Sequence, residues 1–153
     1  MEADHWNIRQ ALQADAAEIT TCVEAAYRHY IPRIGKPPGP MLDDYSRVVG
    51  QHQVFVAEES ERVIGVLVLI KKKSGILMDN VAVLPEYQGQ GLGHRLIRLA
   101  ETRALEQGFQ YLDMYTHELM TENIEMYKRF GYKETKRCVE KGYRRVYMRK
   151  KLL

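Results

Sequence analysis

The chain has 153 residues, of which 45% are hydrophobic and 28% are charged. This balance is typical of a globular protein and excludes an intrinsically disordered chain, while the length suits one domain over residues 1–153. The longest apolar run, residues 63–70, is much shorter than the roughly 20 residues that a membrane-spanning helix requires. We therefore expect a single folded domain that has no membrane partner.

The charge is nearly balanced, with 23 basic and 20 acidic side chains and a net charge of +3. A nucleic-acid-binding domain would concentrate lysine and arginine on one face. The two short basic runs, residues 71–73 and 149–151, each follow a strand-like segment, and a solvated strand end explains both. We therefore expect no nucleic-acid partner.

The cysteines and histidines do not indicate a disulfide framework or a metal site. Cys22 and Cys138 lie far apart, and no two of the five histidines, His5 included, have metal-site spacing. The first ten residues lack the basic-then-apolar pattern of a secretion signal. We expect a cytoplasmic protein without a bound metal.

The N-terminal half predicts two helices and an antiparallel set of strands. Asp15 is a candidate N-cap for the first helix, whose apolar residues recur at helical spacing as far as Tyr27. Residues 32–40, PRIGKPPGP, are predicted to form a loop, because proline disrupts helices and central strands. Strands are expected at residues 6–11, 54–57, 63–70 and 76–84, and the second helix at residues 43–49.

From Leu92 onward the apolar residues recur with the period of a helix, which Gly108 should end. A later helix is expected from a cap at Thr121 to a stop at Gly131, and Gly142 should lie in a hairpin turn. The remaining strands are expected at residues 111–116, 133–138 and 144–149. The order β-α-α-β-β-β-α-β-α-β-β describes a mixed α/β sheet rather than a doubly wound parallel one.

The most informative segment is residues 77–100, where an apolar strand leads through a glycine-rich turn into a helix. Gly89, Gly91 and Gly93 let backbone N–H groups face a ligand, and the helix N-terminus adds unpaired donors and partial positive charge. This pattern predicts a phosphate or pyrophosphate site, although it also suits a tight turn without a ligand. Its spacing fits neither a Walker A loop nor the dinucleotide fingerprint GxGxxG.

The segment QGQGLG, from Gln88 to Gly93, matches the acyl-coenzyme A signature [QR]-x-x-G-x-[GA] of the GNAT superfamily of N-acetyltransferases. Residues 123–132, NIEMYKRFGY, resemble the helix of that family that ends in Tyr-x-x-x-Gly-[FY]. The expected order of strands also agrees from residue 6 to residue 149. The chain thus resembles a GNAT N-acetyltransferase. The resemblance implies a mixed, largely antiparallel sheet of about seven strands with about four helices, splayed between the fourth and fifth strands.

The resemblance implies acetyl-CoA as cosubstrate and direct acetyl transfer without a covalent enzyme intermediate. The pantetheine arm would pair with Val81 and Val83, and an N–H near Val81 would support the oxyanion. Asn123 would contact the cosubstrate or cap its helix, although some members place this asparagine where Met120 stands here. The implied cosubstrate-binding residues are Val81, Ala82, Val83, Gln88, Gly89, Gln90, Gly91, Leu92, Gly93, His94, Asn123 and Tyr127.

Three side chains acquire catalytic roles from the resemblance. Tyr127 aligns with the tyrosine that protonates the departing thiolate, although it could simply pack its helix onto the sheet. Asp79 would accept the proton of the acceptor amine, and Asp113 is a rival for that role on the next strand. Each aspartate could instead be a structural residue, such as a strand-end aspartate that bonds a backbone N–H.

Two functions stay open at this point. The first is an N-acetyltransferase that acts on a primary amine of an unidentified small molecule, peptide or protein. The second is a catalytically idle module that binds acyl-CoA as a sensor or partner. Residues 32–40, together with Tyr27, Tyr30 and Tyr45, are expected to form one wall of the acceptor site. Relatives implied by the resemblance are commonly homodimers, and the oligomeric state of this chain stays open.

Overall fold

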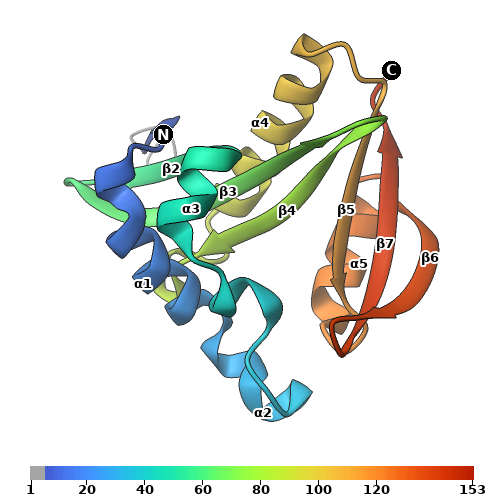
Figure 1. Cartoon of the computed structure of the whole chain (residues 1–153), viewed down its shortest axis with the longest axis horizontal. Helices are drawn as coiled ribbons and strands as arrows, with labels where there is room; N and C mark the ends of the chain where they lie inside the picture. Colours follow the sequence, from blue (N-terminus) through green and yellow to red (C-terminus); the bar gives the residue numbers. More distant parts are fainter. Residues whose placement is uncertain (1–5) are drawn as a thin grey trace.

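The computed structural model describes residues 6–153, so His5 and the start of the segment examined for a secretion signal lie outside the described residues. Its strands form one seven-stranded sheet in the order β1-β2-β3-β4-β5-β7-β6, in which only the β4–β5 pair is parallel (Figure 1). The strands are β1 (Asn7–Gln10), β2 (Gln53–Glu59), β3 (Arg62–Lys72), β4 (Gly75–Val83), β5 (Tyr111–His117), β6 (Lys133–Glu140) and β7 (Tyr143–Lys151). This confirms the expected mixed, largely antiparallel sheet.

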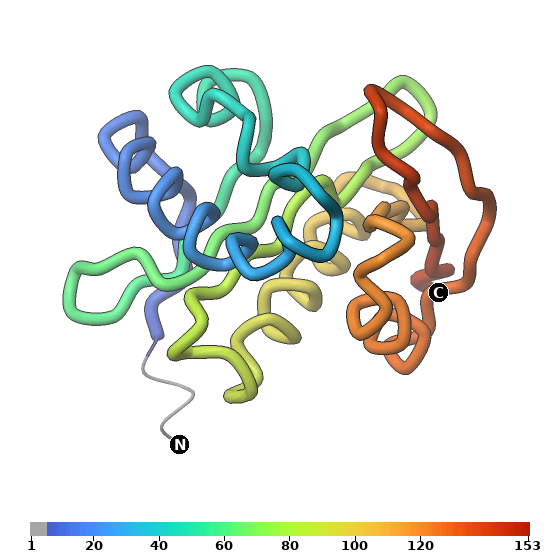
Figure 2. The backbone as a smooth tube through the Cα atoms, turned by 90° about the horizontal axis from the view of Figure 1, so that it is seen from below, coloured from blue at the N-terminus to red at the C-terminus, as the bar shows by residue number. Residues whose placement is uncertain are grey.

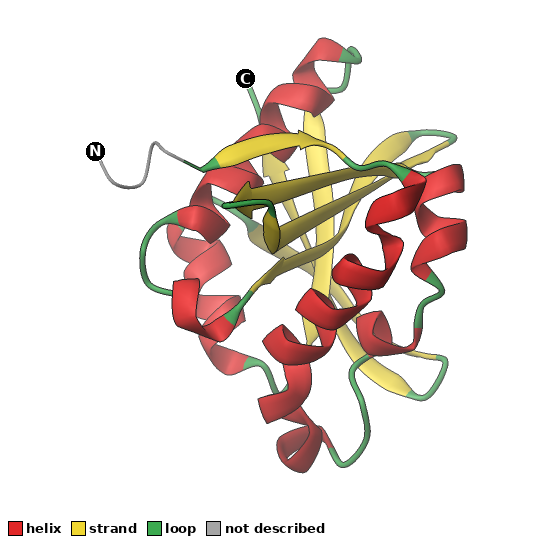
Figure 3. Ribbon diagram, turned by 90° about the vertical axis from the view of Figure 1, so that its left-hand side faces the viewer, coloured by secondary structure: helices red, strands yellow, loops and turns green. Residues whose placement is uncertain are grey.

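Helices cover both faces of this sheet. Figure 2 shows α1 and α3 on one face and α4 and α5 on the other, and Figure 3 shows the helices on both sides of the sheet. Because β3 is sandwiched between the two layers, its residues 63–69 are all buried, which explains the long apolar run in the sequence. The helices are α1 (Ala16–Tyr27), α2 (Ile31–Ile34), α3 (Tyr45–Gln51), α4 (Leu92–Glu106) and α5 (Thr121–Arg129). Within residues 6–153 no helix is long and apolar enough to cross a membrane.

The sheet opens between β4 and β5. The two strands pair only at Leu77 with Asp113 and at Met78 with Met114, and beyond these residues they diverge, as Figure 1 shows. On its other edge β4 stays paired with β3 as far as Val83, with one irregularity. Val68 pairs with Asn80 and Leu69 with Met78, which leaves Asp79 as the extra residue of a β-bulge. The expected splay between the fourth and fifth strands is therefore present.

The proline-rich stretch is partly helical, so the prediction of a loop throughout residues 32–40 is wrong. Pro32 lies in the first turn of α2. Backbone N–H groups of the first turn have no partner within the helix, so the N–H that proline lacks is not needed there, and the fixed φ of proline suits a helix. Gly35, with φ of +92°, ends this turn. A 3₁₀ turn, η4 (Gly39–Leu42), then leads toward α3.

The two predicted helix caps have different outcomes. Asp15 does occupy the N-cap position of α1, but its carboxylate accepts the Leu12 N–H at 2.7 Å and pairs with Arg9 at 2.8 Å rather than bonding an N–H of α1. Thr121 is already inside α5 and makes no cap. The helix expected from residue 43 begins at Tyr45, because the Asp44 carboxylate accepts the Ser46 N–H at 3.1 Å.

We expect Gly65→Val to destabilise the fold, because α4 packs closely on β3 at this glycine. A Cβ at Gly65 would lie 3.2 Å from methyl carbons of both Leu92 and Leu96. Such overpacking costs about 1–3 kcal/mol, which urea unfolding would measure. In the control Gly75→Val the Cβ would meet only a carboxylate oxygen of Asp113, at 3.7 Å. Equal unfolding free energies for the two variants would contradict this packing argument.

Candidate active site

Two hollows lie along the opening between β4 and β5. We call the first the glycine-loop groove; it is lined by residues 81–83, the glycine turn before α4 and one side of α5. We call the second the tyrosine cleft; its walls include Tyr27, Tyr115, Tyr143, Asp79 and Arg145. Four residues line both hollows: Tyr27, Val81, Asn123 and Tyr127. A molecule in the groove and a molecule in the cleft would therefore meet beside these residues.

The open edge of β4 presents backbone groups to this junction. The Val81 carbonyl accepts the Tyr27 hydroxyl at 3.1 Å, and the Val83 carbonyl accepts Gln88 Nε2 at 3.0 Å. Residues two apart turn their N–H and C=O groups to the same side of a strand. Because Tyr27 and Gln88 donate to these two carbonyls from the open side of β4, the N–H groups of Val81 and Val83 face that side as well.

The glycine turn forms the far end of the groove. Gly89 and Gly91 have φ values of +80° and +92°, and a Cβ at either position would meet no atom within 4 Å. Gly91 is the N-cap of the 15-residue helix α4, so the unpaired N–H groups of its first turn lie at the groove. These donors and the positive end of the helix dipole can bind an anion such as a pyrophosphate.

The groove contains most, but not all, of the predicted cosubstrate residues. The exceptions are Gln90, whose exposed amide donates to the Glu86 carbonyl at 3.2 Å, and Leu92, whose side chain is 1% exposed in the core. The His94 ring lines the groove and stacks on Phe130, with centroids 4.1 Å apart. The Asn123 side chain lies at the junction, where its amide contacts the Met120 sulfur at 3.7 Å.

Tyr127 lies at the junction with its ring packed and its hydroxyl open. The side chain is 7% exposed, and its ring makes an edge contact with Tyr132 at 5.5 Å. Its hydroxyl forms no hydrogen bond to any other residue in the described part of the chain. Burial raises its pKa above the usual value for tyrosine, so the hydroxyl stays protonated at neutral pH. The ring therefore packs α5 while the proton remains available to a ligand.

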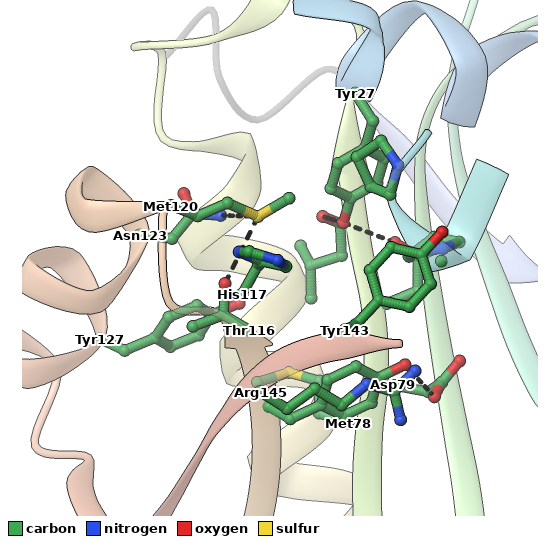
Figure 4. A pocket seen from close by; sticks show the side chains of 16 residues that line it. Tyr27, Met78, Asp79, Thr116, His117, Met120, Asn123, Tyr127, Tyr143 and Arg145 are labelled. Atoms are coloured by element: carbon green, nitrogen blue, oxygen red, sulfur yellow. Dashed lines mark hydrogen bonds between the residues drawn. The ribbon is translucent and has the colours of Figure 1, made fainter. Parts of the chain in front are cut away.

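Asp79, the bulge residue, places its carboxylate in the tyrosine cleft. The Tyr115 hydroxyl donates to Asp79 Oδ1 at 2.9 Å and fixes the orientation of the carboxylate (Figure 4). Burial and the Asp79 charge raise the pKa of Tyr115, so this donor stays protonated. One carboxylate oxygen is thus held by a phenol, and the group faces the cavity.

Asp113 is not brought to the junction. It lies in the part of β5 that is still paired with β4, and its carboxylate binds Arg149 at 2.7 and 3.2 Å. It lines a separate hollow with residues such as Lys72 and Tyr147. The structure therefore separates the two aspartates that the sequence offered as alternative bases.

The segment around the prolines forms one wall of the tyrosine cleft. Pro38, Gly39 and Pro40 line it together with Tyr27. Tyr45 is 2% exposed and lies behind this wall, where its hydroxyl donates to the Pro40 carbonyl at 2.7 Å. Tyr30 lines the glycine-loop groove instead. The three tyrosines that the sequence grouped together therefore have three different positions.

The same segment is tied across the opening of the sheet. Lys36 Nζ donates to the Gly142 carbonyl at 2.7 Å, and the Tyr143 hydroxyl donates to the Pro37 carbonyl. Arg33 Nη1 pairs with Glu122 at 2.6 Å. These contacts join the α1–α3 connection to the far half of the sheet, so the segment roofs the cleft.

Sequence reasoning missed several cleft residues, namely Asn80, Tyr115, Tyr143 and Arg145. Tyr143 and Arg145 are two apart on β7 and so share a face, but that signal is common to every strand. His117 also lines the cleft, and its Nδ1 accepts the Leu119 N–H at 3.0 Å. Burial lowers the pKa of His117. Among residues 6–153 no group of three His, Cys, Asp or Glu side chains is arranged to hold a metal ion.

This arrangement, with an anion-binding turn beside a splayed strand and a buried tyrosine, agrees with the comparisons. A family model described as an acetyltransferase (GNAT) domain matches residues 50–134. The chain therefore belongs to the GNAT acetyltransferase family.

Individual relatives are distant. Thialysine N-epsilon-acetyltransferase of Bos taurus is 23% identical over 122 residues, which are 80% of this chain. The chain spans 62% of the length of that relative. Among solved structures, the ribosomal-protein-S18-alanine N-acetyltransferase of Escherichia coli has a TM-score of 0.77 at 15% identity, covering 96% of this chain and 94% of its own. An Elizabethkingia anophelis GNAT acetyltransferase with acetyl-CoA bound has a TM-score of 0.73 at 16% identity, covering 97% and 99%.

Because Asp113 lies outside both hollows, we expect Asp113→Asn to leave turnover within about twofold of the wild type. The ion pair that it loses is partly exposed, so the unfolding free energy should fall by less than about 1 kcal/mol. Steady-state kinetics and urea unfolding would test both values. A loss of turnover of a hundredfold or so, the lower range for removing a general base, would place Asp113 in the reaction after all.

Proposed function

We propose that the protein is an acetyl-CoA-dependent N-acetyltransferase that transfers the acetyl group directly to a primary amine. The observation that carries this proposal is the meeting of the two hollows at Val81 and Tyr127. One hollow suits a long anionic cosubstrate, and the other suits an amine beside a carboxylate. Both substrates would then reach one point without a covalent enzyme intermediate.

The cosubstrate would occupy the glycine-loop groove. Its pantetheine amides would pair with the backbone of Val81 and Val83, as an added strand does. Its pyrophosphate would rest on the N–H groups between Gln88 and His94, at the N-terminus of α4. The E. anophelis relative with acetyl-CoA bound supports this choice of cosubstrate.

The acceptor would enter through the tyrosine cleft. Asp79 would accept the ammonium proton, directly or through water, so that the neutral amine can attack the thioester carbonyl. The Val81 N–H would stabilise the oxyanion that forms. Tyr127 would protonate the departing thiolate, since its hydroxyl is free and protonated. The names of the bovine and E. coli relatives describe amine acceptors and support an amine here.

The competing function is an acyl-CoA-binding module that catalyses no transfer. The presence of Asp79 and Tyr127 beside the junction favours the enzyme. We also propose that residues 6–153 act as one unit, because Tyr27 and Tyr143 line the cleft from outside the matched residues 50–134. Thiol release from acetyl-CoA with a panel of amines tests the proposal. Tight acetyl-CoA binding without thiol release for any amine would favour the idle module.

We expect Gly91→Glu to weaken acetyl-CoA binding by about tenfold or more, because it places a negative charge at the pyrophosphate site. Gly108→Glu is a matched control. Gly108 has φ of +89°, and a Cβ there would also meet no atom within 4 Å, so the two variants carry the same backbone strain. Titration calorimetry would compare their affinities. Equal affinities would contradict the placement of the pyrophosphate.

We expect Tyr127→Phe to lower kcat by about 10² to 10⁴, the usual worth of a general acid, with little change in acetyl-CoA affinity. Because burial raises the pKa of Tyr127 above its ordinary value of about 10, the acid form persists as pH rises. The wild-type rate should therefore show no loss from this group up to about pH 10. A kcat within about threefold of wild type would show that Tyr127 only packs α5.

A further inference from the structure

Arg145 brings a positive charge into the tyrosine cleft. It lies on β7, its side chain is only 15% exposed, and it lines the cleft with Tyr115 and Asp79. Its guanidinium carbon lies 4.3 Å from the centroid of the Tyr115 ring. A cation that has given up much of its hydration in this way interacts strongly with any anion that reaches it.

Asp79 and Arg145 are arranged around one aromatic ring. The Tyr115 hydroxyl binds Asp79 Oδ1 at 2.9 Å, while Arg145 lies over the face of the same ring. Figure 4 shows the two side chains close together at the same end of the cleft. The cleft therefore presents a negative and a positive group a short distance apart, and no ion pair joins the two.

Glu140 binds only one side of the Arg145 guanidinium, and the other side faces the cleft. Nη1 donates to Glu140 Oε1 at 3.1 Å, and this oxygen also accepts the Tyr147 hydroxyl at 2.6 Å. Nη2 points to the opposite wall, where a Cβ at Gly39 would lie 3.6 Å away. Glu140 thus holds the arginine in place, and the half of the fork beside Gly39 faces the cleft.

A second cation lies at the roof of the cleft. Lys36 Nζ lies 4.1 Å from the centroid of the Tyr143 ring, and Tyr143 lines the cleft. The cleft therefore carries a second cation at its roof, in addition to the neighbouring Arg145 and Asp79.

We propose that the acceptor carries a carboxylate close to its amine, so that it is a free amino acid or a compound of that class. Its ammonium would lie beside Asp79 and its carboxylate beside Arg145, with Tyr115 between the two charges. The inference rests on the proposed function, because it describes the acceptor of the same site. A simple amine would leave the Nη2 side of Arg145, which Glu140 does not bind, without an anionic partner, so we expect the site to discriminate against such amines.

The test compares matched pairs of probes that differ only in the carboxylate: L-lysine with cadaverine, and L-phenylalanine with phenethylamine. Titration calorimetry in the presence of coenzyme A measures binding, and thiol release from acetyl-CoA measures turnover. We expect the carboxylated member to bind at least about tenfold more tightly, as a charge-assisted pair allows. Arg145→Gln should remove this preference mainly through Kd and KM, and Arg145→Lys should keep part of it.

The control is Arg144→Gln, which makes the same charge change on the same strand. Arg144 is exposed, points to the other face and pairs with Glu118 at 3.5 Å, so the preference should survive. Equal binding within the pairs, a preference that persists in Arg145→Gln, or no binding of any probe would overturn the inference. Thiol release from simple amines alone would overturn it while the proposed function stands. Arg145-dependent binding without thiol release would leave the inference standing and defeat the proposed function.

Discussion

The loss of pairing between β4 and β5 after Met78 is the constraint on which the site depends. An unpaired strand edge inside a protein leaves polar backbone groups that need partners. Here the carbonyls of Val81 and Val83 receive side-chain donors, Tyr27 and Gln88, rather than another strand. A carbonyl has two lone pairs, and the N–H groups on the same edge remain directed into the opening. The edge is therefore stable without a ligand and can still pair with one.

The parts of the site that are local in sequence could be predicted. The glycine turn, the helix after it and the strand before it are encoded in residues 77–100, and the structure has all three. The end of α4 near Gly108 and the hairpin at Gly142 were also predictable, because glycines with positive φ occupy these turns. The prediction that residues 32–40 form only a loop failed. It treated Pro32 as a helix breaker, whereas the first turn of a helix accepts proline readily.

The rest of the site depends on register, which the sequence does not display. Asp113 and Tyr115 are two residues apart on β5 and therefore share a face. Asp113 lies where β5 still pairs with β4, so it binds Arg149 on a separate surface. Tyr115 follows the last paired residue and reaches Asp79 across the opening. Asp113 and Tyr115 are only two residues apart, yet one forms a surface ion pair and the other lines the cleft. The point at which β4 and β5 separate determines this difference.

The residues that line the two hollows also come from different parts of the sequence. The glycine turn, the β4 edge, Asp79 and Tyr127 all lie within the matched residues 50–134, and these are the groups that would handle the acetyl group and its carrier. The residues that shape the other wall, Tyr27, residues 38–40, Tyr143 and Arg145, lie outside that range. Contacts such as Lys36 with Gly142 connect these outer segments above the cleft. Since fold alone does not fix a substrate, the segments before and after the shared region are where acceptor choice would be encoded. Arg145, the partly buried cation among them, is then the residue that would most narrow the chemistry of the acceptor.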